Sequence, residues 1–282
     1  MADDTDLAPE AYYDQHPDRE ASRLDRLPTG RLEFANTCRE LDAALPTSGH
    51  ILDAGGGPGR YSVWLADRGY TVEYCDLSGE QVRLAIDRVV DHGLADRVGC
   101  RRADIRALPY PADRFDGVCC LGGPVSHLLA PADRQTALTE LGRVATPGAP
   151  ILVAVMGRLA ALRDTIKHVL PDAEPPYGLL EALADDGRYT AERVGRYRDG
   201  DGWAETKFFR AAELEHECEA AGLRVERLVG LEGVASNLAP ELAGVDDAAM
   251  AMVESLVAEH RTDPAVVDNA EHILAVCRPP PD

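Results

Sequence analysis

The residues best placed to do chemistry are acids and glycines that follow short apolar runs. The first run ends at Asp53 and leads into Gly55–Gly59, in which four of five residues are glycine. Asp76 and Asp104 follow two further runs in the same way. Glycine lets a ligand lie directly against main-chain atoms, and a carboxylate accepts hydrogen bonds from hydroxyl and amino groups. This combination predicts a site for a ligand that carries a ribose and an amino-bearing ring.

The glycine spacing separates two cofactors that use such a loop, a dinucleotide and S-adenosylmethionine. A dinucleotide site requires G-x-G-x-x-G, but its third glycine position is occupied here by Arg60 or Ser62, depending on the start. The spacing that fits is D-x-G-x-G-x-G, formed by Asp53, Gly55, Gly57 and Gly59. Each acid also has a structural interpretation, Asp76 as a turn or helix N-terminal carboxylate and Asp104 as a solvated loop acid. Three matching strand ends in series favour a binding site.

Candidate residues for the acceptor side of a reaction follow the fourth apolar run, in the segment LGGPVSHLL. Leu121 and Gly122 would border the ligand, and His127 is the nearby side chain whose pKa suits proton transfer. His127 is therefore the candidate catalytic and substrate-binding residue, and a structural histidine that opens a helix is the alternative. Tyr12 and Tyr13 are candidate substrate contacts on a lid, or else two aromatics docked on the core.

The elements that position these residues alternate as in a parallel sheet with crossover helices. The apolar runs predict strands over Ile51–Asp53, Thr71–Asp76, Val98–Asp104, Phe115–Leu121 and Ile151–Met156. The segments between and after them predict helices over residues 60–68, 79–92, 132–145 and 211–221. Two further strands are expected over Arg224–Gly230 and His272–Arg278.

Two regions interrupt this alternation. Residues 1–48 predict one or two helices, which would form a lid. Residues 157–210 contain a helical piece, the break PDAEPPYG, and the segment RVGRYRDGDGWAETKFF, which resembles a hairpin with DGDG as its turn. Trp203, Phe208 and Phe209 would wall an acceptor pocket in this cap or form the cap's own core. The expected division is a helical lid, a cofactor-binding core, a substrate cap and the C-terminal part of the core sheet, over residues 1–48, 49–156, 157–210 and 211–282.

The composition describes an acidic protein. The 282 residues include 49 acids and 29 bases, for a net charge of -20, and only Lys167 and Lys207 are lysines. Such acidity argues against nucleic acid or an anionic membrane as a partner. The scarcity of lysine beside the acid excess favours adaptation to a salt-rich cytoplasm over ordinary solubility.

The seven cysteines are odd in number and lack a C-x-x-C pair, and no histidine stands at metal-ligand spacing. They predict reduced thiols in the core and argue against a structural zinc site. The acidic N-terminus has no apolar h-region, and no apolar stretch reaches the length of a membrane span. We therefore expect a cytoplasmic protein.

Residues 49–156 resemble the class I S-adenosylmethionine-dependent methyltransferases. LDAGGGPG is similar to their first motif, YCDLS to their ribose-binding acid, and ADIRALPYPADRFDGVCC to their adenine strand and the strand after it. The resemblance implies a Rossmann-like, seven-stranded, mostly parallel α/β sheet with helices on both faces and the last strand antiparallel. It also implies bound S-adenosylmethionine, held by Asp53, Ala54, Gly55, Gly56, Gly57, Gly59, Asp76, Leu77, Asp104, Ile105, Leu121 and Gly122.

The sequence pattern LDAGGG…CDLS, with GRLEF upstream, is also similar to that of a branch that includes tRNA carboxymethyluridine methyltransferases. In that branch an arginine ahead of the first strand helps to bind the cofactor, and Arg31 is the candidate here. Residues 157–210 do not follow the branch, so its substrate is not carried over.

The function favoured by these features is methyl transfer from S-adenosylmethionine to a small-molecule acceptor by in-line displacement. A tRNA-modifying methyltransferase is the second interpretation, although no basic surface is evident in the sequence. A non-catalytic protein that binds S-adenosylmethionine or S-adenosylhomocysteine is the third. The sequence leaves open the acceptor, the atom methylated, the need for a general base and the oligomeric state.

Overall fold

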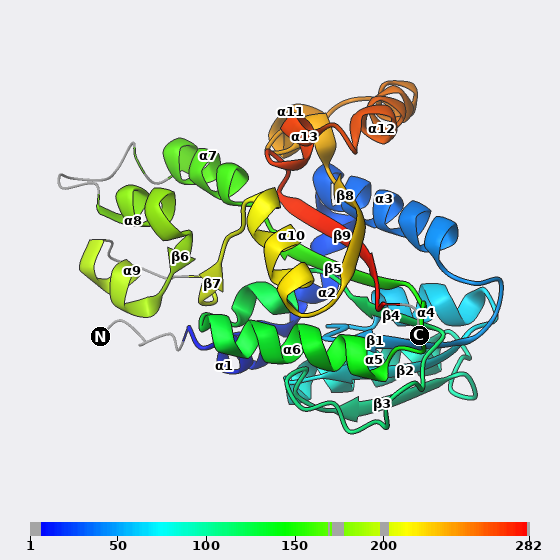
Figure 1. Ribbon diagram of the computed structural model, residues 1–282. Helices are drawn as coiled ribbons and strands as arrows, with labels where there is room; N and C mark the ends of the chain where they lie inside the picture. The colour runs from blue at the N-terminus through cyan, green and yellow to red at the C-terminus, as the bar shows by residue number, and fades with distance from the viewer. Residues whose placement is uncertain (1–6, 169, 171–177, 198–202, 281–282) are drawn as a thin grey trace.

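The centre of the molecule is a seven-stranded sheet in the order β3-β2-β1-β4-β5-β9-β8 (Figure 1). The computed structural model describes residues 7–168, 170, 178–197 and 203–280. The strands are β1 His50–Ala54, β2 Thr71–Asp76, β3 Val98–Arg102, β4 Gly117–Cys120, β5 Ile151–Met156, β8 Arg224–Gly230 and β9 His272–Arg278. All neighbours from β3 to β5 are parallel, whereas β9 is antiparallel to both β5 and β8. The expected fold class and the antiparallel last strand are confirmed.

Helices cover both faces of the sheet. On one face α6 and α10 pack against the strands, and on the other face α3, α4 and α5 do so. The central strands β4 and β5 are buried along their whole length, as expected for strands that are covered on both sides. The helices on these two faces are α3 Pro28–Ala44, α4 Arg60–Asp67, α5 Gly79–Asp91, α6 Pro131–Val144 and α10 Ala211–Ala220.

The N-terminal region divides into two parts with different roles. Helices α1 (Pro9–Gln15) and α2 (Pro17–Arg26) precede α3, so the described part of this region holds three helices rather than one or two. Proline stands at the start of each, where its missing N–H costs no helical hydrogen bond. Cys38 and Leu41 of α3 belong to the core under the sheet, so only α1 and α2 form a lid.

The cap after β5 and the start of the chain pack together. Leu7 and Tyr12 share an apolar cluster with Leu179, Leu183, Tyr189, Val194 and Ala204. The main-chain N–H of Glu205 also donates to the carbonyl of Leu7 at 2.8 Å. The lid and the cap therefore form one unit beside the sheet. Its cap elements are α7 Arg158–His168, α8 Gly178–Asp186, β6 Arg188–Tyr189, α9 Ala191–Tyr197 and β7 Thr206–Lys207.

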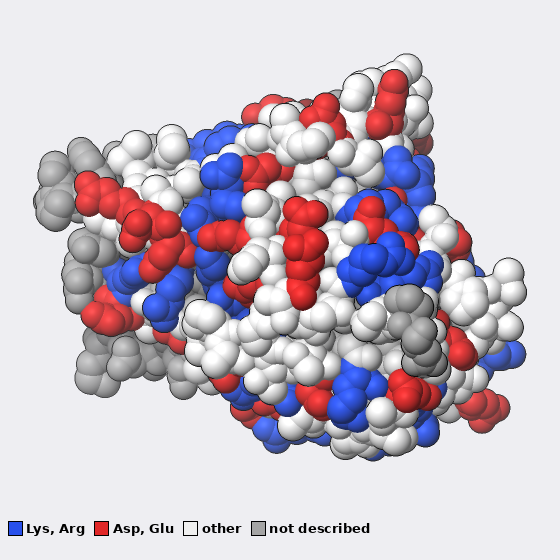
Figure 2. Space-filling view, in the orientation of Figure 1, with Lys and Arg blue, Asp and Glu red and all other residues white. Residues whose placement is uncertain are grey.

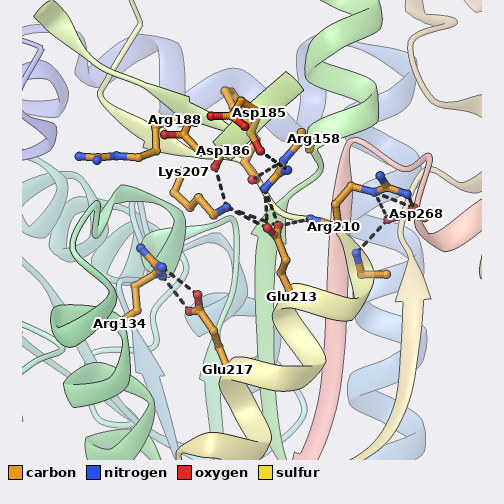
Figure 3. Close-up of polar contacts among 12 residues, drawn as sticks. Arg134, Arg158, Asp185, Asp186, Arg188, Lys207, Arg210, Glu213, Glu217 and Asp268 are labelled. Carbon is orange, nitrogen blue, oxygen red and sulfur yellow. Dashed lines mark hydrogen bonds and ion pairs between the residues drawn. The ribbon is translucent and has the colours of Figure 1, made fainter. Parts of the chain in front are cut away.

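Ion pairs join this unit to α10 (Figure 3). Arg158 Nη2 at the start of α7 donates to both carboxylate oxygens of Glu213, at 2.6 and 2.7 Å. Lys207 Nζ of β7 lies 3.3 Å from Glu213 Oε1. Arg134 of α6 pairs with Glu217 one turn further along α10. The cap is thus anchored to the core through α10.

The expected hairpin over residues 193–209 is wrong in its bounds. An antiparallel pair exists, but its strands are β6 and β7, and helix α9 lies between them. The sequence AERVGRY of α9 begins with residues of high helix propensity, which favours a helix over an extended strand. The DGDG turn, most of the PDAEPPYG break and residues 1–6 lie outside the described residues.

A helical insertion between β8 and β9 had no counterpart in the sequence prediction. It contains η3 Gly233–Ala235, α11 Ala239–Leu242, α12 Asp247–His260 and α13 Pro264–Val267, at the top of Figure 1. Val257 of α12 and Ala235 pack against Leu32 of α3. The insertion therefore supports α3 from outside the sheet.

All seven cysteines are free, and every one except the half-buried Cys100 is buried. This agrees with the expected core thiols. In the described part of the chain, membrane crossing is not supported, since none of its helices combines the necessary length and apolarity.

Candidate functional site

A cavity of about 520 Å³ lies at the carboxyl ends of the parallel strands. Its wall is formed by the segments that follow β1, β2, β3 and β4, and by α1 and α2. This is the edge at which open α/β sheets bind ligands, and the volume lies in the range of small-molecule sites. From the predicted cofactor set, the wall contains Gly55, Gly56, Gly57, Asp76, Leu77, Asp104, Ile105, Leu121 and Gly122.

The loop after β1 needs its glycines for two different reasons. Gly55 and Gly57 have φ of +69° and +53°, a region that side chains disfavour. A Cβ at Gly55 would lie 2.5 Å from Pro124 Cγ, so the loop could not approach the segment after β4. A Cβ at Gly57 would contact only Glu20 Cγ, at 3.7 Å. Gly57 therefore presents bare main chain where α2 closes over the loop.

Asp76 at the end of β2 is held by main-chain donors. Its Oδ1 accepts from Ser78 N at 2.9 Å, and its Oδ2 accepts from Gly57 N at 3.0 Å. Burial raises the pKa of Asp76 to about 6. In the same wall Gln81 Oε1 is buried and has no hydrogen-bond partner. Two acceptors in one wall, one of them unpaired, fit a ligand that donates hydroxyl hydrogens, as a ribose does.

Asp104 and Ile105 follow β3. The carboxylate of Asp104 accepts from Arg106 Nε and Nη2, at 3.0 and 2.6 Å to Oδ2. Burial opposes the charge of Asp104, but these hydrogen bonds from Arg106 lower its pKa overall. The side chain is thus a fixed acceptor, and buried Ile105 gives the wall an apolar surface beside it. An acceptor next to an apolar surface fits an amino-bearing aromatic ring.

Three predicted cofactor residues lie behind the wall. Asp53 is fully buried, and its Oδ2 accepts from Ser62 Oγ at 2.6 Å. Ala54 belongs to the core. Gly59 precedes α4, and a Cβ there would lie 2.9 Å from Ala85 Cβ, so this glycine permits close packing of α4 on α5. These residues position the loop and are absent from its cavity surface.

Arg31 does not reach the cavity, because its exposed side chain turns back to the carbonyl of Asp25 at 3.2 Å. The cavity wall contains Arg23, Arg60, Arg88 and Arg106. Arg23 on α2 is the one of these that precedes β1, and Glu20 one turn earlier lines the cavity with it. Arg23 Nε donates to Glu20 Oε1 at 2.9 Å. Burial opposes its charge, while Glu20 and Glu33 raise its pKa overall. Arg31 on α3 and Arg23 on α2 both precede β1, and of the two Arg23 lines the cavity.

A buried charged cluster stands behind Arg23. Glu33 of α3 pairs with Arg23 and, at 3.5 Å, with His272 Nδ1, which also binds Glu232 Oε1 at 2.6 Å. Despite burial, Glu33 and Glu232 raise the pKa of His272 to about 9. The ligand atoms of Glu33, Glu232 and His272 lie within 4.8 Å of one another, a spacing that a metal could use. Because the charges compensate each other, we assign the cluster to holding Arg23. Local sequence patterns do not predict this cluster, since its members are far apart in the chain.

His127, at the end of η1 (Pro124–His127), lies in the cavity wall with Tyr13 of α1 and Glu205 of the cap. The other predicted acceptor residues lie elsewhere. Tyr12 is buried in the lid–cap cluster, and Trp203 is 54% exposed and absent from the cavity wall. Phe208 packs beside that same cluster and Phe209 in the core, so the cap aromatics do not form an acceptor pocket.

The fold and the strand-end position of this site resemble those of class I S-adenosylmethionine-dependent methyltransferases. Residues 51–148 match the family model of a methyltransferase domain. The protein therefore carries a methyltransferase domain of this class, for which S-adenosylmethionine is the cofactor. The glycine loop, the Asp76 and Gln81 acceptors and the apolar Ile105 surface fit that molecule.

Similar proteins match this chain over only part of their own length. Methyltransferase GfsG from Streptomyces halstedii is 36% identical over 128 residues, covering 45% of this chain and 42% of the relative. The ubiquinone/menaquinone biosynthesis C-methyltransferase UbiE of Vibrio campbellii is 28% identical over 160 residues, covering 53% of this chain and 58% of the relative. The chain thus spans about half the length of these relatives.

The fold extends over more of the chain. A structure from Methanosarcina mazei, described as an S-adenosylmethionine-dependent methyltransferase, superposes on this chain with a TM-score of 0.60 at 18% identity. It covers 86% of this chain and 98% of that chain. At this identity the likeness establishes the fold, and function has to be argued from the site.

Proposed function

We propose that this protein is a cytoplasmic methyltransferase that transfers the methyl group of S-adenosylmethionine to a small-molecule acceptor. One observation carries the proposal: the cofactor wall around Asp76 and the titratable His127 line the same cavity. The names of the relatives support it, since UbiE is described as a C-methyltransferase of quinone biosynthesis.

In this proposal the two ends of the cofactor are held by different parts of the chain. Asp76 and Gln81 accept from the ribose hydroxyls, and Asp104 with Ile105 takes the adenine. Glu20 and Arg23 on α2 hold the amino-acid end, the acid against its ammonium group and the guanidinium against its carboxylate. Arg23 uses three of its five N–H donors on Glu20 and Glu33, which leaves two for a ligand.

Bound S-adenosylmethionine supplies an electrophilic methyl group on a sulfonium. The chain's own contribution is to orient the acceptor and to exclude water from the cavity. Helices α1 and α2 close the cavity over the strand ends, and Leu121 and Pro124 line it after β4. His127 is the side chain in this wall placed to take a proton from the acceptor, if the acceptor must lose one.

Surface charge favours a small acceptor over tRNA. The net charge is -20, and acidic and basic groups alternate on the face shown in Figure 2. A site for a phosphate backbone calls instead for a continuous basic surface. The acid excess also supports the proposal that the protein works in a salt-rich cytoplasm.

The function is tested with S-adenosylmethionine labelled on its methyl group. Purified protein is incubated with a filtered small-molecule extract of its source cells and, separately, with total tRNA. We expect label in an organic-soluble product and formation of S-adenosylhomocysteine. Label only in tRNA would establish the tRNA-modifying alternative, whereas tight cofactor binding without any transfer would indicate a non-catalytic binder.

A further inference from the structure

The hydrogen-bond chain through His127 fixes which of its nitrogens faces the cavity as an acceptor. His127 Nδ1 lies 2.9 Å from the main-chain carbonyl oxygen of Glu205, which can only accept. The proton therefore sits on Nδ1, and Nε2 carries the lone pair. Tyr13 Oη lies 2.8 Å from Nε2, so the Tyr13 hydroxyl donates to His127.

The surroundings keep this imidazole neutral. Burial lowers the pKa of His127, outweighing the Glu205 carbonyl and the Glu20 carboxylate, which both favour the charged form. The charged groups that act on Tyr13 from the neighbouring elements are Glu20 and Arg23 of α2 and Asp76 of β2. Nε2 is thus the neutral base of a half-buried imidazole, and its present partner is a phenol.

The ring of Tyr13 also indicates which ligand shape fits the part of the cavity beside His127. The Tyr13 and His127 rings meet edge to face, with centroids 5.3 Å apart and an angle of 78° between their planes. Leu121, Pro124 and Leu128 give the surrounding wall apolar surface. Tyr13 is carried by α1, a short helix of the lid and no part of the central sheet. A planar ring with a hydroxyl at its edge therefore fits beside His127.

We propose that the methyl acceptor is a hydroxylated aromatic ring whose hydroxyl replaces that of Tyr13 on His127 Nε2. This inference rests on the proposed function and names its substrate class. The acceptor's O–H bond breaks, an N–H bond forms at Nε2, and the electron pair of the O–H bond stays on the acceptor as its nucleophile. The resulting imidazolium is stabilised by the Glu205 carbonyl on Nδ1 and by Glu20.

The other common acceptor groups fit this place less well. A carboxylate carries no proton for Nε2 at neutral pH, and it would stand close to the acids Glu20 and Asp76. An ammonium group has a free lone pair only after it loses its proton, and the neighbouring acids Glu20 and Asp76 favour its charged form. A hydroxyl on an aromatic ring is neutral before the reaction, so it donates to Nε2 without adding charge and keeps its electron pair as the nucleophile.

The test is a binding experiment with two probes, the second of which carries a methyl group in place of the donated hydrogen. The full-length protein, saturated with S-adenosylhomocysteine, is titrated calorimetrically with 2-naphthol and with its methyl ether, 2-methoxynaphthalene. We expect the wild type to prefer 2-naphthol by at least tenfold, consistent with one buried hydrogen bond. In His127→Phe the preference should disappear. In Tyr13→Phe the affinity for 2-naphthol should rise several-fold, because no hydroxyl of the protein competes for Nε2.

S-adenosylhomocysteine binding by each variant shows whether its cavity is intact. Equal affinity for the two probes in the wild type and in Tyr13→Phe, or a preference that survives in His127→Phe, would overturn the inference. Failure of S-adenosylhomocysteine to bind the wild type would overturn the proposed function instead. The two failures are therefore distinguishable.

Discussion

Arg23 of α2 and Glu33 of α3 form a two-point ion pair in which Arg23 Nη2 lies 3.0 Å from Glu33 Oε1 and Nη1 also donates to Glu33. Glu33 is buried, and Arg23 lines the cavity. A buried acid thus holds a guanidinium at the place where the cofactor's amino-acid end is proposed to lie.

Replacing Arg23 should therefore affect only ligands that possess this end. We expect Arg23→Gln to weaken S-adenosylhomocysteine binding by about tenfold or more, because a charge-assisted hydrogen bond is worth roughly 1.5–3 kcal/mol. Binding of 5′-methylthioadenosine, which lacks the amino-acid end, should change less than threefold. Arg31→Gln is the matched control and should leave both affinities unchanged. Equal losses for the two ligands would place Arg23 in a general structural role.

Asp53 should lower stability at high pH. Burial raises its pKa from 3.8 to about 6, so the folded protein holds this proton more tightly than the unfolded chain does. The resulting stabilisation is complete below about pH 4 and is lost as the pH rises through 6. We expect Asp53→Asn to raise the free energy of unfolding by about 1–3 kcal/mol at pH 8 and to have little effect at pH 4. Urea unfolding at both values checks this, and an equal destabilisation at both would contradict it.

The anchor between the cap and α10 should contribute measurably to stability. Arg158 is buried, while its partner Glu213 is partly exposed and keeps Lys207 as a second cation. We expect Arg158→Ala to lower the free energy of unfolding by about 1–3 kcal/mol, which is less than the loss expected for a fully buried ion pair. Arg224→Ala removes an exposed ion pair with Glu226 and should lower the free energy of unfolding by less than about 0.5 kcal/mol. Chemical unfolding of the two variants compares them, and similar losses would argue against the anchor.

Salt should stabilise the protein. With a net charge of -20, repulsion among surface carboxylates opposes the compact state, and molar salt screens it. We expect the melting temperature to rise from dilute buffer to molar salt. A flat or falling curve would favour ordinary acidity over adaptation to high salt.

Most of the sheet could be predicted because the apolar pattern of each strand lies within its own segment of the sequence. Runs buried on both faces must be apolar, and the buried strands β5 and β9 have the bounds that their runs predict. The edge strand β8 also has its predicted bounds. The cavity residues at the strand ends could also be predicted from the local sequence, since Asp76 is the last residue of its strand. The hairpin failed where helix propensity in α9 competed with a turn signal further along the chain.

The rest of the site depends on contacts between distant segments. Arg23 reaches the cavity because Glu33 and His272, from α3 and the start of β9, hold it there. Tyr13 reaches His127 because the lid packs on the cap. Nothing in the local sequence distinguishes Arg23 from Arg31, or Tyr13 from Tyr12, because their roles follow from helix docking.

Cofactor binding at the strand ends is tested most directly by calorimetric titration with S-adenosylmethionine. Asp76 is exposed to the cavity and Asp91 lies on the outer end of α5, so Asp76→Ala and Asp91→Ala form a matched pair. We predict that the wild type and Asp91→Ala bind alike and that Asp76→Ala binds at least tenfold more weakly, in line with roughly 1.5–3 kcal/mol for a hydrogen bond to a charged group. Tight binding of NADH without binding of S-adenosylmethionine, or equal affinity in both variants, would contradict the account.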